Sequence, residues 1–138
     1  TGQFFRRESG LAQTAAQVMT PLSRVTRTTA EAMLSACFQK VRDSGHVRLP
    51  VFSEDGSRCV GVLNALDVLY LAPDPDQTRV RDFMRQPLFV NGDVRADDVL
   101  PLMRQNRQPM VMVRSAQSGA VVGIMTEENV LSALTGSL

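Results

Sequence analysis

The stretch GIMTEENV, residues 123–130, decides how the chain divides. A glycine lies in an apolar run, and Thr126 then opens a polar, acidic turn that leads into a second apolar run. This order is typical of a strand that ends where a capped helix begins. The stretch GVLNALDV, residues 61–68, has the same skeleton, which indicates an internal repeat.

The repeat extends in both directions from these two stretches. VMTPLSRV, residues 18–25, matches FMRQPLFV, residues 83–90, and Pro50 falls opposite Met112. The chain therefore divides into two copies, and each is expected to be too short for a core of its own and to pack against the other.

The division predicts a lead-in over residues 1–17, a first copy over residues 18–76 and a second over residues 77–138. A short helix is expected in the lead-in from about Leu11. The prolines and aspartates of LAPDPDQTRVRD, residues 71–82, are typical of a loop between the copies.

Within the first copy the hydrophobic period changes along the chain. Residues 23–27 predict a short strand, and residues 28–45 predict a helix with Thr28 and Glu31 in capping-box register and Gly45 as its stop. A hairpin around residues 55–56 and a second helix over residues 64–72 complete a β-α-β-β-α order.

The second copy repeats this order with one irregularity. Pro101 falls inside a predicted helix over residues 96–107 and should kink that helix or move its start to a later residue. A hairpin around residues 117–119 and a helix from about Glu127 follow. The fold class is therefore α/β (α+β), with two β-α-β-β-α repeats.

Composition excludes several classes of function. The chain has 138 residues, 43% hydrophobic and 21% charged, with a net charge of +1, which is typical of a folded domain and gives no footprint for nucleic acid or an anionic membrane surface. No apolar run is long enough to span a bilayer. Because the chain starts at Thr1, we expect it to be an excised piece of a longer protein.

The cysteine and histidine content argues against catalysis and against a metal site. Cys37 and Cys59 lie in apolar runs, form no CxxC pair and are expected to be free, buried thiols in a reducing compartment. The single histidine, His46, is expected in a loop or at a strand edge and excludes most zinc and Ser-His-Asp schemes. With no nucleophile paired to a base, we expect no enzyme.

Five motifs in this order resemble the CBS (cystathionine-β-synthase) domain pair, or Bateman module, of the hemolysin-like CorC/CNNM family of magnesium and cobalt efflux proteins. They are VMTPLSRV, SGHVRLPVF, GVLNALDVL, RQPLFV and GIMTEENVLSAL. The resemblance covers about residues 17–138. It implies two repeats packed with pseudo-two-fold symmetry, a flat homodimer of two modules, and a parent membrane protein whose cytoplasmic domain regulates ion efflux across the inner membrane.

The resemblance also implies an adenine nucleotide, ATP or AMP, alone or with magnesium, in the cleft between the repeats. Carried over onto this sequence, the nucleotide-binding residues are a set drawn from both copies: Thr20, Arg48, Leu49, Pro50, Thr126, Glu127 and Asn129. Asn64 and Asp67 form the mirrored, second candidate site. Asn129 departs from the family, because an aspartate that binds the ribose is usual there.

Each of these residues also has a purely structural interpretation. Thr126 and Asn129 suit a capping box, although the open amides of the same helix start also suit phosphate. Asn64 and Asp67 suit a capped helix with an acid in its first turn, and Arg48 suits a surface strand as well as a bidentate phosphate contact. The acidic run of Glu127 and Glu128 could approach a magnesium ion that arrives with ATP, but it fits a solvated first turn better.

Two functions remain open on the sequence alone. The first is a regulatory module that binds an adenine nucleotide, with affinity reduced about fivefold because a neutral amide replaces a carboxylate at Asn129. The second is a structural dimerisation module whose nucleotide site is weakened or lost.

Two further features have more than one interpretation. The methionines of the second copy fit core filling, although a few could form apolar walls for adenine. The basic patch RQNRQ, residues 104–108, fits a solvated helix end, a dimer contact or a site for a triphosphate tail.

Overall fold

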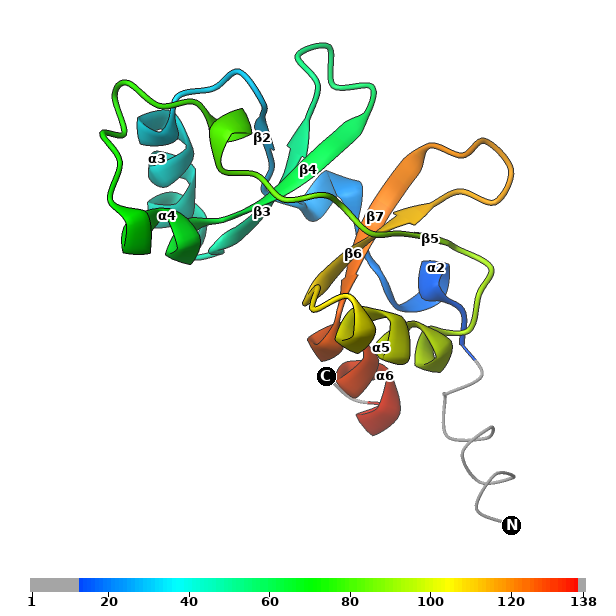
Figure 1. Cartoon of the computed structure of the whole chain (residues 1–138). Helices are drawn as coiled ribbons and strands as arrows, with labels where there is room; N and C mark the ends of the chain where they lie inside the picture. The colour runs from blue at the N-terminus through cyan, green and yellow to red at the C-terminus, as the bar shows by residue number, and fades with distance from the viewer. Residues whose placement is uncertain (1–12, 137–138) are drawn as a thin grey trace. The chain divides into compact units, whose positions relative to one another are not determined.

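Each half of the chain builds a small sheet with helices, in the β-α-β-β-α order that the sequence predicts (Figure 1). The computed structural model describes residues 13–136. By its contacts the chain forms two units: residues 26–87, here the first-repeat unit, and residues 1–25 with 88–138, here the second-repeat unit.

The first-repeat unit has a sheet in the order β2-β3-β4. β2 runs parallel to β3, and β3 forms an antiparallel hairpin with β4. The elements of this unit are β2 (Thr28–Thr29), α3 (Leu34–Ser44), β3 (Arg48–Phe52), β4 (Cys59–Asn64), α4 (Ala65–Leu71) and the 3-10 turn η3 (Val80–Asp82).

The second-repeat unit repeats this plan and adds a strand, in the order β1-β7-β6-β5. β5 runs parallel to β6, β6 forms a hairpin with β7, and β1 pairs antiparallel to β7. Its elements are α2 (Ala15–Val18), β1 (Thr20–Pro21), the 3-10 turn η2 (Leu22–Arg24), β5 (Phe89–Asn91), α5 (Ala96–Gln105), β6 (Met110–Arg114), β7 (Val121–Thr126) and α6 (Glu127–Thr135).

The segment leading into each repeat packs on the body of the other repeat. Residues 13–25 contribute α2 and β1 to the unit that contains β7, and residues 75–87 belong to the unit that contains β4. Ala15 and Val80 are both fully buried there, one in each core. The crossing of these segments explains why each unit is larger than a repeat body alone.

The crossing segments also explain the two glycines that mark the repeat. A Cβ added at Gly61 would lie 2.7 Å from the sulfur of Met84, and one at Gly123 would lie 2.6 Å from the sulfur of Met19. Each glycine therefore gives room for the methionine of the other repeat's lead-in. At Gly123 the backbone carbonyl of Thr20 also lies too close for a side chain.

Each unit buries a hydrophobic cluster of its own, so the expectation that a copy has too few residues for a core is wrong. The borrowed lead-in residues supply part of each cluster, which is why the repeat bodies alone underestimate it. Leu34, Leu49 and Leu63 are fully buried in the first-repeat unit, and Met103, Val111 and Met125 are nearly or fully buried in the second.

Two predictions at the start of the first repeat are wrong. The strand expected over residues 23–27 is a 3-10 turn over Leu22–Arg24, followed by β2 at Thr28–Thr29. Thr28 cannot cap a helix because it is buried in the parallel pairing with β3. The helix α3 instead begins at Leu34, after Met33, which forms no side-chain cap.

The glycine turns predicted from the sequence are confirmed. Gly45 ends α3 with a left-handed φ of 77°, and Gly56 and Gly119 turn the two hairpins with φ of 75° and 76°. α5 begins at Ala96 and continues through Pro101, so a later start is wrong. Its first turn is held by a contact that does not involve Pro101, because the Ala96 amide donates to the Gln13 carbonyl at 2.9 Å.

Candidate functional site

Thr126 and Asn129 form a complete capping box at the start of α6. The Asn129 side-chain oxygen accepts from the Thr126 backbone amide at 2.8 Å and from the Thr126 hydroxyl at 2.9 Å. The Asn129 backbone amide donates back to that hydroxyl at 3.4 Å. The structural interpretation of these two residues is confirmed. Both are half-buried, so a ligand can still reach them.

Thr20 joins this pair from the other end of the chain. The Asn129 side-chain amide donates to the Thr20 hydroxyl at 3.2 Å. Strand β1 holds Thr20 opposite Ile124 of β7, and the neighbouring Pro21 pairs with Gly123. The structure therefore brings together three of the predicted contact residues, Thr20, Thr126 and Asn129, which we call the Thr20 cluster.

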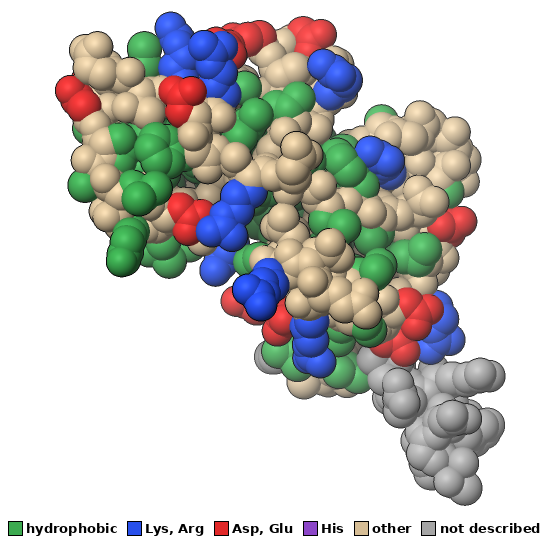
Figure 2. Space-filling model, in the orientation of Figure 1, with side chains coloured by type: hydrophobic (Ala, Val, Ile, Leu, Met, Phe, Trp, Pro, Cys, Tyr) green, Lys and Arg blue, Asp and Glu red, His purple; other side chains and the backbone are tan. Residues whose placement is uncertain are grey.

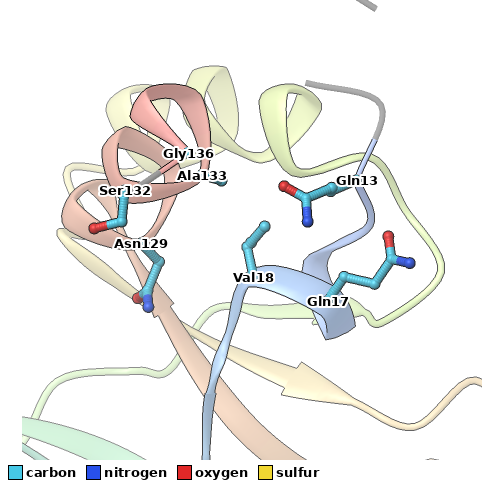
Figure 3. A pocket seen from close by; sticks show the side chains of 7 residues that line it. All are labelled: Gln13, Gln17, Val18, Asn129, Ser132, Ala133 and Gly136. Atoms are coloured by element: carbon cyan, nitrogen blue, oxygen red, sulfur yellow. The ribbon is translucent and has the colours of Figure 1, made fainter. Parts of the chain in front are cut away.

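A shallow pocket of about 380 Å³ adjoins the Thr20 cluster in the second-repeat unit (Figure 3). Asn129 belongs to both. Among residues 13–136 no charged side chain lines the pocket, and in Figure 3 Val18 and Gln13 reach from the α2 side toward α6. Its lining residues are Gln13, Gln17, Val18, Asn129, Ser132, Ala133 and Gly136.

The sequence analysis missed the lining of this pocket, although a signal for part of it was present. Ser132, Ala133 and Gly136 follow Asn129 at helical spacing of three, four and seven residues, so they share its helix face. Gln13 and Gln17 are four residues apart in the lead-in. That the lead-in packs against α6 depends on the crossing of the lead-ins, which no local pattern shows.

The acids beside the cluster face solvent. Glu127 and Glu128 are exposed in the first turn of α6, where their charge is favourable beside the positive end of the helix dipole. Over residues 13–136 no group of three or more histidine, cysteine, aspartate or glutamate side chains is placed to hold a metal ion. Figure 2 shows basic and acidic side chains interspersed over the visible face.

Arg48, Leu49 and Pro50 belong to β3 of the first-repeat unit. Leu49 is fully buried in the core of that unit, and Pro50 is also buried, so neither presents a side chain to a ligand. Arg48 lies opposite Asn64 in the hairpin, and its Nε is buried with no hydrogen-bond partner among the described residues. An orphaned guanidinium nitrogen is costly and is a ready donor to an anion.

The mirrored pair in the first-repeat unit is engaged within the protein. The Asn64 side chain caps α4 by accepting from the Leu66 amide at 3.1 Å. Asp67 forms an ion pair with Arg85, with 2.7 Å between Oδ2 and Nη2. The sequence analysis missed Arg85, although the matched motifs VMTPLSRV and FMRQPLFV place it at the position of Thr20.

The cysteines and most of the second-copy methionines are structural. Cys37 and Cys59 are free and buried, as predicted, and burial raises the pKa of the Cys37 thiol to about 11. His46 is exposed. Four methionines of the second copy fill the core, which confirms that interpretation for Met103, Met110, Met112 and Met125.

The chain is similar to known proteins in both sequence and fold. The model of the CBS domain family matches twice, over residues 15–74 and 80–136. The magnesium and cobalt efflux protein CorC of Escherichia coli (strain K12) is 30% identical over 122 residues, which is 88% of this chain and 41% of that protein. CorC of Vibrio cholerae is also 30% identical. The chain thus spans about two fifths of the length of these curated relatives.

Solved structures agree with the family match. The CBS domain of the bacterial CNNM/CorC family Mg2+ transporter in complex with ATP has a TM-score of 0.86 and 25% identity, and each chain covers the other completely. CBSX2 in complex with AMP, with a TM-score of 0.77 and 23% identity over 90% of this chain and 97% of that one, shares the fold.

No helix within residues 13–136 is long and apolar enough to cross a membrane.

Proposed function

We propose that this chain, which belongs to the CBS domain family and carries two CBS domains in tandem, is a regulatory module that binds an adenine nucleotide, ATP or AMP, at the Thr20 cluster. The observation that carries the proposal is the meeting of Thr20, Thr126 and Asn129 at the open first turn of α6. The relative with bound ATP is similar over its whole length, which supports the same ligand class.

The chemistry of the cluster suits the sugar end of a nucleotide. Two threonine hydroxyls and one carboxamide can both donate to and accept from ribose hydroxyls. The first amides of α6 and its positive dipole end favour a phosphate nearby. Arg48 of the first-repeat unit, with its orphaned Nε, is proposed as an anion ligand on its chemistry alone, and a magnesium ion would be held by the nucleotide's own phosphates.

Asn129 is expected to weaken binding without abolishing it. Its oxygen already accepts from the Thr126 amide and hydroxyl, so a ribose hydroxyl must compete for the remaining acceptor capacity. A neutral acceptor also lacks the charge assistance of a carboxylate, a difference of about 1 kcal/mol. The chain should therefore respond to nucleotide at higher concentration than a relative with aspartate at this position.

The role of the module in a parent protein follows from its relatives. We propose that it is the cytoplasmic regulatory domain of an inner-membrane magnesium or cobalt efflux protein and that it acts on the membrane domain of the same chain. Nucleotide would bias the conformation of the module, and this bias would pass through residues 13–25, which carry Thr20 and lead in from the chain's start. No catalytic role and no nucleic-acid partner are proposed.

Thermal melting with ATP, ADP and AMP, each with and without magnesium, tests the proposal. A ligand that binds only the folded state raises the melting temperature by mass action. We expect a rise with at least one nucleotide at millimolar concentration, and a smaller rise in Thr20→Val, which keeps a β-branched side chain but loses the hydroxyl. If no nucleotide shifts the melting of the wild-type chain, the proposal is wrong.

A second candidate function, a structural dimerisation module, is favoured by the exposed apolar side chains of α4. Leu66, Leu69 and Tyr70 are 52%, 64% and 89% exposed, and their spacing of three and four residues places them on one helix face. Hydrophobic side chains gather on the surface at α4 in Figure 2. We propose that a second copy of the chain covers this face in a homodimer.

Light scattering distinguishes the dimer from a monomer. We expect a dimer mass for the wild-type chain and a monomer mass for Leu69→Glu, because a charge in the centre of the face is costly to bury. Asp76→Glu, in an exposed loop, is the matched control and should remain dimeric. A wild-type monomer at high concentration would rule out this assembly.

A further inference from the structure

Arg85 occupies, in the first-repeat unit, the place that Thr20 holds in the second. Arg85 and Thr20 follow the matched methionines Met84 and Met19. Asp67 and Asn129 likewise hold matched places, each at the third position of its helix. Each unit therefore has one contact between its borrowed lead-in and the first turn of its last helix.

The two contacts differ in charge. Arg85 and Asp67 are joined by an ion pair of 2.7 Å, whereas Asn129 and Thr20 share a hydrogen bond of 3.2 Å between neutral groups. A hydrogen bond between charged partners is shorter and about twice as strong as a neutral one. A ligand hydroxyl displaces the neutral contact more easily.

The backbone fixes the position of Arg85. Its amide donates to the Val62 carbonyl at 2.8 Å, and its carbonyl accepts from the Val62 amide at 3.0 Å. The side chains of Arg85 and Asp67 are 54% and 28% exposed, so the carboxylate is the more buried partner of the ion pair. A hydroxyl that approaches Asp67 must displace Arg85 and leave its charge without that partner.

We infer that Arg85 closes the first-repeat unit to nucleotide, so that each chain binds a single nucleotide at the Thr20 cluster. Asp67, although it is the residue type that usually binds ribose, is held by Arg85 and takes no part. This inference rests on the proposed function for the location of the one occupied site. It adds that the identity of a lead-in residue, threonine or arginine, decides which unit accepts ligand.

Calorimetric titration of the whole chain with ATP tests this inference through the number of sites. We expect one site in the wild type and one in Arg85→Lys, which keeps the cation. Arg85→Thr, which copies the residue at Thr20, should raise the number to two, and the double variant Arg85→Thr, Asp67→Asn, which copies both Thr20 and Asn129, should keep two sites with a weaker affinity at the new one. Melting curves of all four proteins show that each is folded.

Each outcome separates this inference from the proposed function. Two sites in the wild type, or one site in both the wild type and a folded Arg85→Thr chain, would overturn the role of Arg85. If the wild type binds no ATP but Arg85→Thr binds one, the role of Arg85 stands and the proposed site at the Thr20 cluster fails. If neither protein binds ATP, both fail.

Discussion

The two units share one backbone plan and differ in the chemistry placed on it. In the second-repeat unit the contact between lead-in and helix is neutral and adjoins a pocket, through Thr20 and Asn129. In the first-repeat unit the same contact is the ion pair of Arg85 and Asp67. The comparison teaches that a retained aspartate is not by itself the sign of an open site, because the carboxylate of Asp67 is already engaged by Arg85.

A second pair of contacts shows that residue types can swap positions between the two units while the backbone arrangement is kept. In the first-repeat unit Arg27 lies over the ring of Phe52, at 5.2 Å from its centre. In the second-repeat unit Arg114 lies over Phe89, at 3.7 Å. In the strand registers Arg27 precedes Thr28, which pairs with Val51, and Phe89 precedes Val90, which pairs with Val113. By this register Phe89 is equivalent to Arg27 and Arg114 to Phe52, so the cation and the ring have changed sides. The contact survives because either arrangement satisfies it.

The largest expected difference between the units concerns the two glycines. In Gly123→Ala the new methyl group meets the Thr20 backbone, which cannot move without breaking the β1–β7 pairing, so we expect a loss of about 3 kcal/mol in unfolding free energy. In Gly61→Ala the two nearest atoms belong to the flexible Met84 side chain and the Arg85 carbonyl oxygen lies at 3.0 Å, less close than the Thr20 carbonyl at Gly123, so a smaller loss of about 1 kcal/mol is expected.

Urea denaturation of the two variants measures this difference. Gly56→Ala is not a suitable control, because Gly56 has a positive φ and its substitution adds backbone strain. The double variant Gly61→Ala, Met84→Ala is informative instead, since it should not be less stable than Met84→Ala alone by more than a few tenths of a kcal/mol. Equal losses at Gly61 and Gly123 would contradict the difference in contacts.

A smaller difference is expected at alkaline pH. Burial raises the pKa of Cys37 from 9.0 to about 11, and Val99 holds the matched place in the second-repeat unit. Below pH 9 the thiol is protonated in both states and stability is complete. Between pH 9 and 11 the unfolded chain loses the proton first, so stability should fall by about 2 kcal/mol.

Urea denaturation from pH 8 to 11 checks the role of Cys37. Other groups titrate over this range, so the wild type is compared with Cys37→Val, which copies Val99. The wild type should lose about 2 kcal/mol more than Cys37→Val as the pH rises. Parallel curves for the two proteins would show that Cys37 contributes nothing to the pH dependence.

The sequence predicted the elements that depend on local pattern. The turns at Gly45, Gly56 and Gly119 depend only on the local backbone conformation that glycine permits. The cap of α6 joins Thr126 to Asn129, which is only three residues later. Non-local pairing was the source of the errors. Thr28 resembles a helix cap but pairs with β3, and the partners of Thr20 and Arg85 follow from lead-ins that cross to the other repeat.

The residues of the candidate site could be named from the sequence, but their packing partners could not. The grouping of Thr20 with Thr126 and Asn129 came from resemblance to a family, since more than a hundred residues separate the two parts of the cluster and no periodicity joins them. The pocket and Arg85 were missed, because both require the packing of a lead-in on a helix from the other repeat.

The affinity for ATP of two matched variants, measured by calorimetric titration, tests the central claim most directly. Asn129→Asp should tighten binding about fivefold, because a carboxylate accepts from ribose with charge assistance and Thr20 can turn its hydroxyl to donate to it. Asp67→Asn, the same exchange in reverse at the matched place, should leave the affinity unchanged. No change in Asn129→Asp, or a clear loss in Asp67→Asn, would contradict the assignment of nucleotide binding to the Thr20 cluster.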